Sequence, residues 1–160
     1  MAGRRARSTK NINAQYEDLC LRNDDPEHLK KVWIDNVIGY GVFVTKSFDK
    51  DDAILEYKGE VIDRFEAERR HKIYQSNGEG CFIFDVDSCN FKLSVDATKS
   101  SNLGRYVNDS AGKFANCRPK SFLFNGHPRI ILVATKFISA NTELRYDYND
   151  KQNLSWRSDV

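Results

Sequence analysis

The sequence predicts a mainly β (α+β) fold in which many short strands enclose one core. Short runs rich in β-branched and aromatic residues recur between clusters of Gly, Asp, Asn and Lys. The pair Asn125-Gly126 lies between two such runs, as in a tight hairpin turn. The length of 160 residues suits one domain with a sizeable core, so two domains are not expected.

The chain begins with a basic segment. Residues 4–10 carry four positive charges and no apolar residue larger than alanine, a composition typical of a disordered arm. This arm, residues 1–10, is either a nuclear-targeting or nucleic-acid-binding signal or a solvated tail. A net charge of only +2 gives no reason to expect a broad nucleic-acid-binding face elsewhere on the chain.

Composition also argues against several classes of protein. Four cysteines are widely spaced and form no Cys-x-x-Cys pair, so we expect reduced thiols and no metal site: Cys20, Cys81, Cys89 and Cys117. No apolar run reaches the roughly 18–20 residues that span a bilayer. No apolar stretch follows the basic segment as in a secretory signal. We therefore expect a soluble, intracellular monomer with no membrane partner.

The first elements can be assigned in order along the chain. Residues 12–22 predict a short helix, which ends at the acidic and proline-containing turn 23–26. Strands are predicted over residues 32–37, 41–48, 53–62, 81–86 and 91–95. A second helix is predicted over residues 64–75 and is closed by Gly78 and Gly80; its inward stripe comprises Phe65, Ala67 or Glu68, and Tyr74.

A hairpin and a final strand follow. Residues 121–124 and 127–137 flank the Asn-Gly turn and are expected to pair with each other. After a second turn at 139–141, strict alternation over residues 143–148 predicts a strand. One face of that strand then carries Leu144, Tyr146 and Tyr148, and the other carries Glu143, Arg145 and Asp147. Two phenols therefore point the same way.

Several segments, taken in order, resemble the SET domain, the fold of protein lysine methyltransferases that use S-adenosylmethionine. They are Ile38-Gly39-Tyr40-Gly41-Val42-Phe43, Glu56-Tyr57-Lys58-Gly59, Gly80-Cys81-Phe82, Val95-Asp96-Ala97-Thr98, Gly104-Arg105-Tyr106-Val107-Asn108-Asp109-Ser110 and Glu143-Leu144-Arg145-Tyr146-Asp147-Tyr148. Each segment alone is an ordinary turn or core pattern, and the joint order carries the resemblance. It implies a β-clip fold of several small sheets with a pseudoknot-like C-terminal threading.

The resemblance also implies a domain organisation and a set of functional residues. The basic arm precedes an N-terminal flanking segment at 11–36, a SET domain at 37–149 and a C-terminal tail at 150–160. The catalytic residues would be Tyr148, Tyr146 and Tyr57. The substrate lysine channel would be lined by Tyr57, Cys81, Phe82, Phe84, Tyr146 and Tyr148. S-adenosylmethionine would contact Ile38, Gly39, Tyr40, Phe82, Arg105, Asn108, Asp109 and Trp156. Trp156 either stacks on the adenine ring or covers a patch of core.

Such a channel suits the chemistry, because methyl transfer needs the neutral amine of a lysine whose free pKa is about 10.4. An apolar aromatic channel disfavours the ammonium by desolvation and aligns the amine with the methyl group. Tyr146 falls at the position that controls product number in the family, and a tyrosine there resembles monomethylating members.

Within the family, these motifs are most similar to those of the branch that monomethylates the histone H4 tail. This implies a nuclear, chromosome-associated protein that acts on a histone tail or nucleosome, or on a non-histone protein. Asp109 stands where the family usually has histidine, and Ile38 and Tyr40 stand where that branch has basic residues. The alternative is a degenerate SET module that binds peptide or cofactor without turnover. A third hypothesis, a nucleic-acid adaptor, rests only on the basic arm.

Overall fold

The computed structural model describes residues 11–86 and 92–148. The predicted basic arm, the tail with Trp156, Cys89 and the first residue of the strand predicted at 91–95 lie outside the described residues. No helix in the described part of the chain is long and apolar enough to cross a membrane.

The elements follow one another closely along the chain. Helix α1 (Ile12–Leu21) precedes the strands β1 (Leu29–Asp35), β2 (Gly39–Val44), β3 (Ala53–Glu56) and β4 (Glu60–Asp63). Helix α2 (Arg64–Ser76) is followed by β5 (Ile83–Val86), β6 (Leu93–Asp96) and the 3-10 helix η1 (Leu103–Tyr106). The last strands are β7 (Asn108–Asp109), β8 (Cys117–Phe124), β9 (His127–Ala134) and β10 (Arg145–Tyr146).

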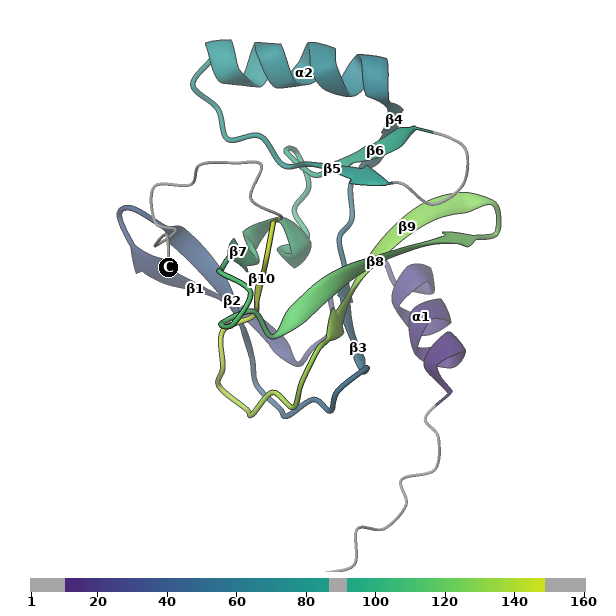
Figure 1. Cartoon of the computed structure of the whole chain (residues 1–160), viewed down its shortest axis with the longest axis vertical. Helices are drawn as coiled ribbons and strands as arrows, with labels where there is room; N and C mark the ends of the chain where they lie inside the picture. The colour runs from purple at the N-terminus through teal and green to yellow at the C-terminus, as the bar shows by residue number, and fades with distance from the viewer. Residues whose placement is uncertain (1–10, 87–91, 149–160) are drawn as a thin grey trace, which may run out of the picture.

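Within the described residues these strands form four small sheets, ordered β1-β2, β3-β9-β8, β4-β6-β5 and β10-β7. Figure 1 shows α2 lying over the β4-β6-β5 sheet, while α1 lies beside the β8-β9 hairpin. β10 pairs in parallel with β7, with Arg145 opposite Asn108 and Tyr146 opposite Asp109. The C-terminal strand therefore crosses back to a segment that precedes the whole hairpin, as the predicted threading requires.

The largest core cluster is built mainly from β2, β3, β9 and the segments around β7 and β10. Its buried members are Leu29, Val42, Val44, Phe48, Ile54, Leu55, Val107, Cys117, Leu132, Ala134, Ile138, Leu144 and Tyr146. Burying one such aliphatic side chain stabilises the fold by about 1.5–3 kcal/mol. Leu144 and Tyr146 are buried whereas Glu143 and Arg145 are only partly so, which confirms the predicted inward face of the tyrosine strand.

The hairpin prediction is confirmed. Asn125 and Gly126 have φ angles of 50° and 79°, as the two central residues of a type I′ turn require. The register places Phe124 opposite His127, and the paired strands extend from Cys117 to Ala134. The predicted helices also match closely. Asn11 caps α1 by accepting the N–H of Ala14, and Asp63 caps α2 by accepting the N–H of Glu66.

Three predictions about the elements before β5 are wrong. Residues 53–62 form two strands in different sheets, because the chain leaves the β3 sheet at Tyr57 and joins the β4 sheet after Gly59. Phe65 is 80% exposed, so the inward stripe of α2 consists of Ala67 and Tyr74. β1 also ends earlier than predicted, since the Asp35 carboxylate accepts the backbone N–H groups of Val37 and Ile38 and so forms a turn.

Candidate functional site

Four of the aromatic residues predicted to line the lysine channel lie next to one another. The ring centroids of Tyr57 and Phe84 are 5.8 Å apart, those of Phe84 and Tyr146 are 6.5 Å apart, and those of Tyr146 and Tyr148 are 4.4 Å apart. They come from the β3-β4 junction, β5 and the C-terminal strand. The fold therefore gathers residues far apart in sequence into one aromatic row.

The phenols in this row are protonated at neutral pH. Burial raises the pKa of Tyr57, Tyr146 and Tyr148 above the ordinary tyrosine value. The Tyr57 hydroxyl donates to the Phe82 carbonyl at 2.9 Å, and the Tyr148 hydroxyl donates to the Val107 carbonyl. These tyrosines therefore line the site with protonated, hydrogen-bonding phenols. Their raised pKa values make them unsuited to act as bases.

The remaining predicted channel residues, Cys81 and Phe82, lie at the edge of the row. Phe82 packs against the cluster that contains Tyr57, and its backbone N–H donates to the Thr98 hydroxyl at 3.1 Å. Cys81 is half-buried, and its Sγ lies 3.2 Å from Nδ1 of His71 on α2. This contact joins the edge of the row to α2.

Asn108 links three of the segments predicted to hold the cofactor. Its Nδ2 donates to the Tyr40 carbonyl at 3.1 Å and to Glu143 Oε1 at 3.0 Å. The β2 backbone comes very close at this point, because a Cβ atom at Gly41 would lie 2.6 Å from Glu143 Oε1 and 3.3 Å from Asn108 Nδ2. Gly39 has a φ of 78°, which a side chain would disfavour. The backbone angle thus favours glycine at 39, and a side chain at 41 would displace the Glu143 carboxylate that accepts from Asn108.

Two cations and three rings lie along the same side of the site. Arg105 stacks over Phe82 and Tyr106 at 4.6 and 4.7 Å, and donates to the Thr98 carbonyl at 2.7 Å. Lys31 Nζ lies 4.6 Å from the centroids of both Tyr40 and Tyr106, whose rings are 6.0 Å apart. Arg105 Nε is buried and finds no acceptor among the described residues. A positively charged, aromatic surface with an unused donor fits a cofactor that carries a carboxylate and a nucleoside.

Sequence reasoning missed three residues of this site. Glu143 was placed only on the outward face of its strand, yet it fixes Asn108. Lys31 and Tyr106 belong to segments whose local patterns say nothing about a shared surface. For Glu143 the alternation of residues 143–148 was a usable signal, whereas the Lys31–Tyr106 contact depends on long-range folding. Ile38 contributes backbone to the β1-β2 turn, and Trp156 lies outside the described residues.

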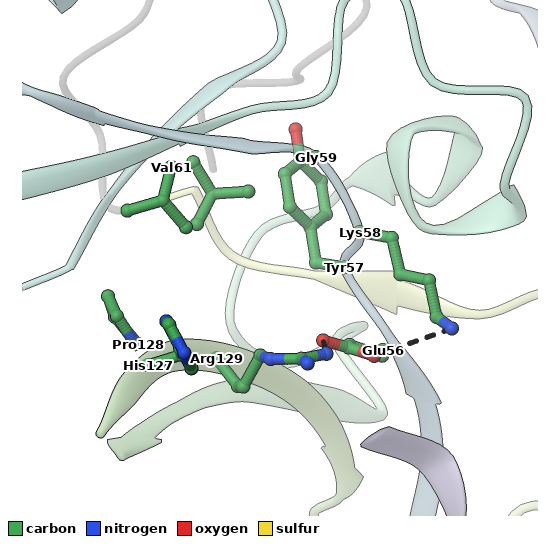
Figure 2. A pocket seen from close by; sticks show the side chains of 9 residues that line it. Glu56, Tyr57, Lys58, Gly59, Val61, His127, Pro128 and Arg129 are labelled. Atoms are coloured by element: carbon green, nitrogen blue, oxygen red, sulfur yellow. Dashed lines mark hydrogen bonds and ion pairs between the residues drawn. The ribbon is translucent and has the colours of Figure 1, made fainter. Parts of the chain in front are cut away.

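A separate hollow of about 300 Å³ lies behind Tyr57, between the β3-β4 junction and the start of β9. Figure 2 shows the Glu56 carboxylate between Arg129 and Lys58, at 2.7 and 3.6 Å. Arg129 and Lys58 also donate to the carbonyls of Cys20 and Arg22 at the end of α1. These contacts tie α1 to β3 and β9, and of the predicted channel residues only Tyr57 lines the hollow. No metal-binding group of three or more His, Cys, Asp or Glu side chains occurs in the part of the chain that the structure describes.

Comparison with known proteins agrees with this architecture. Residues 39–149 match the model of the SET domain family. The chain is 38% identical over 143 residues to N-lysine methyltransferase KMT5A-A of Danio rerio, covering 88% of this chain and 41% of that protein. It is 36% identical over 119 residues to N-lysine methyltransferase KMT5A-A of Xenopus laevis, covering 73% of this chain and 35% of that protein. It thus spans well under half of the length of these relatives.

A solved structure is similar over nearly the whole chain. The crystal structure of CpSET8 from Cryptosporidium superposes with a TM-score of 0.78 at 26% identity, covering 92% of this chain and 69% of that one. The likeness confirms the predicted fold class of several small sheets with few helices. Together with the family match over most of the chain, it settles the classification: the chain belongs to the SET domain family.

Proposed function

We propose that this chain transfers a methyl group from S-adenosylmethionine to the ε-amine of a protein lysine and mainly stops at one methyl. The observation that carries the proposal is the row of buried and half-buried rings Tyr57, Phe84, Tyr146 and Tyr148, with Asn108 and Arg105 in the neighbouring segment. Relatives named N-lysine methyltransferase support the same reaction class. The proposed substrate is the histone H4 tail, free or in a nucleosome, with a non-histone protein as the second choice and the nucleus as the site of action.

The bound cofactor would supply a methyl group on a positively charged sulfur. The aromatic row would disfavour the charged form of an inserted lysine, because burial away from water lowers the pKa of an amine. It would also hold the narrow side chain in line for displacement, which lowers the entropic part of the barrier. Asn108, Arg105 and the glycine-containing β1-β2 turn would hold the cofactor. No acid–base pair is required of the protein.

Crowding around Tyr146 supports a monomethyl product. Its ring is buried and lies 4.4 Å from that of Tyr148 and 6.5 Å from that of Phe84. By resemblance to monomethylating members of the family, its hydroxyl would restrict the rotation of an already methylated amine. We therefore expect Tyr146→Phe to shift the product toward dimethyl-lysine, as read by mass spectrometry of a lysine peptide. Mostly trimethyl product from the unmodified protein, unchanged in Tyr146→Phe, would contradict the assignment.

Labelled methyl transfer to nucleosomes and free histones tests the reaction itself. We expect Tyr148→Phe to lower the rate at least about tenfold, which corresponds to ~1.4 kcal/mol of transition-state stabilisation. Tyr16→Phe is the matched control, since Tyr16 packs on the hairpin in a different cluster. Equal rates for Tyr148→Phe and Tyr16→Phe would remove Tyr148 from the reaction.

The degenerate SET module remains the second candidate, because Asp109 replaces the histidine usual in the family. It predicts cofactor binding by calorimetry with no label transferred to histones, nucleosomes or a proteome extract. Nucleic-acid binding through residues 1–10 stays a separate prediction. Deleting that arm should then abolish binding and leave methyl transfer to a short peptide intact.

A further inference from the structure

We propose that Asp109 is a positioning residue whose carboxylate holds the backbone of Tyr148 and thereby fixes the Tyr148 phenol. This inference rests on the proposed function, since it assigns Tyr148 to the reaction. The carboxylate would thus do a defined task at the one position of the Asn108-Asp109-Ser110 segment that departs from the family.

The geometry begins with a very short parallel ladder. β7 and β10 run side by side in Figure 1, and each contributes two residues. The ladder is continued by the N–H of Ser110, which donates to the Tyr146 carbonyl at 3.1 Å. Arg145 Nη2 donates to the Asp109 carbonyl at 2.9 Å. Asp109 itself is 1% exposed, so its side chain lies inside this junction.

Tyr148 lies beyond the end of the ladder. Its backbone N–H donates to Asp109 Oδ1 at 2.8 Å, so a side chain replaces the next rung of the sheet. A hydrogen bond to a carboxylate is shorter and stronger than one between neutral groups. This hydrogen bond therefore holds the C-terminal strand against β7 two residues beyond Tyr146, at Tyr148 itself.

The same short segment also holds the other end of Tyr148. Its hydroxyl donates to the carbonyl of Val107, two residues before Asp109. Residues 107–109 thus bind Tyr148 at two points: Asp109 accepts its backbone N–H and Val107 accepts its hydroxyl. A displacement of only about 1 Å in a reacting group can reduce a rate about a hundredfold. Loss of either hydrogen bond is consequently expected to lower turnover more than it weakens substrate binding.

The charge of Asp109 adds a second effect. Burial raises the pKa of the Tyr148 phenol most, a hydrogen bond with Tyr146 lowers it, and the nearby Asp109 carboxylate raises it. Burial and the Asp109 charge therefore both favour the protonated phenol, which donates to the Val107 carbonyl. Asparagine at this position would retain an oxygen acceptor of the same shape and lose the charge, whereas alanine would lose the acceptor as well.

These differences define the experiment. Asp109→Ala should lower kcat at least about tenfold with the KM for peptide within about twofold, and Asp109→Asn should recover most of kcat. The matched control is Asp52→Ala. Asp52 is also a buried carboxylate that accepts a backbone N–H, from Asp49 at 2.8 Å, but it lies in the β2-β3 connection. Asp52→Ala should lower Tm and leave kcat unchanged. Equal kcat losses in Asp52→Ala and Asp109→Ala would overturn the inference.

A second measurement does not depend on turnover. Amide hydrogen exchange of Tyr148, followed by NMR, should accelerate at least about tenfold in Asp109→Ala and return toward the unmodified rate in Asp109→Asn. An unchanged exchange rate in Asp109→Ala overturns the inference even if the enzyme is active. Failure of the unmodified protein to methylate any substrate would instead overturn the proposed function, while the amide measurement still decides whether Asp109 holds Tyr148.

Discussion

Gly59 is the residue at which the chain changes sheets. A Cβ atom at this position would lie 2.4 Å from the backbone oxygen of Asp96 and 2.8 Å from the nitrogen of Ala97. Because both contacts are backbone, neither can rotate away. We expect Gly59→Ala to destabilise the protein by about 1–3 kcal/mol, measured by urea unfolding. Gly112→Ala is the control, since its nearest contact would be an ordinary 3.5 Å to Asp147 Oδ2. Equal stability of the two variants would contradict this account.

The shared face of the two tyrosines could be predicted from the sequence, but the residues that hold the neighbouring segments together could not. Alternation alone predicts that Tyr146 and Tyr148 share a face, because strand geometry has a period of two. The contacts of Asn108 with Tyr40 and Glu143 join three segments that are distant in sequence. No local pattern encodes such contacts, so the residues that fix the site become visible only in the folded chain.

Arg70 helps to hold helix α2 on its sheet, together with Arg64 and Tyr74. Arg70 donates to Glu60 at 2.7 Å, to Glu66 at 2.8 Å and to the buried Asp96 at 3.1 Å. Hydrogen bonds from Arg69 and Arg70 lower the pKa of Glu66 to about 2. Burial tends to raise the pKa of Asp96, but hydrogen bonds from Thr98, Tyr74 and Arg70 outweigh it and lower that pKa.

The direction of these shifts fixes the pH dependence. A lowered carboxyl pKa contributes stability that is present above the ordinary range near 4 and is lost as pH falls toward about 2. Arg70→Gln should therefore cost about 2 kcal/mol at pH 7, mainly through Asp96, and progressively less on acidification, as thermal unfolding would show. Arg69→Gln, which loses only an exposed contact with Glu66, should cost less. A deficit in Arg70→Gln that stays constant from pH 7 to 2 would exclude this network.

Elements with strong local signals were predictable and others were not. The Asn125-Gly126 turn demands positive φ angles, and the helix ends were signalled by the proline-containing turn at 23–26 and by Gly78, whose φ is 68°. The prediction of a single strand over residues 53–62 was wrong because the change of sheets at Gly59 depends on long-range pairing, of β3 with β9 and of β4 with β6. The prediction that Phe65 faces inward was wrong because one apolar residue at helical spacing does not specify which face of α2 meets the sheet.

For the whole molecule, Cys117 reports on whether the C-terminal strand is in place. Its thiol is 2% exposed and contacts the Arg145 carbonyl at 3.4 Å. Burial raises the pKa of Cys117 to about 12, so almost no thiolate is available at pH 8. Alkylation of Cys117 should require opening of β10, and Leu144→Ala, which costs about 2–5 kcal/mol, should accelerate it. Peptide mapping by mass spectrometry would detect this. Unchanged labelling in Leu144→Ala would show that another motion exposes the thiol.

The parallel pairing of β7 with β10 also dictates an order of folding. The β8-β9 hairpin closes over the tight Asn125-Gly126 turn, whereas β10 must return past the whole hairpin to reach β7. Closing a long loop costs conformational entropy before the contacts that stabilise it can form. We therefore expect β10 to pair after the hairpin has formed. A chain still emerging from the ribosome would then hold the hairpin before the aromatic row is complete, because Tyr146 and Tyr148 arrive with the C-terminal strand. Pulsed hydrogen exchange during refolding should accordingly protect the amides of the β8-β9 hairpin before the Ser110 amide, which donates to the Tyr146 carbonyl, and simultaneous protection would refute this order.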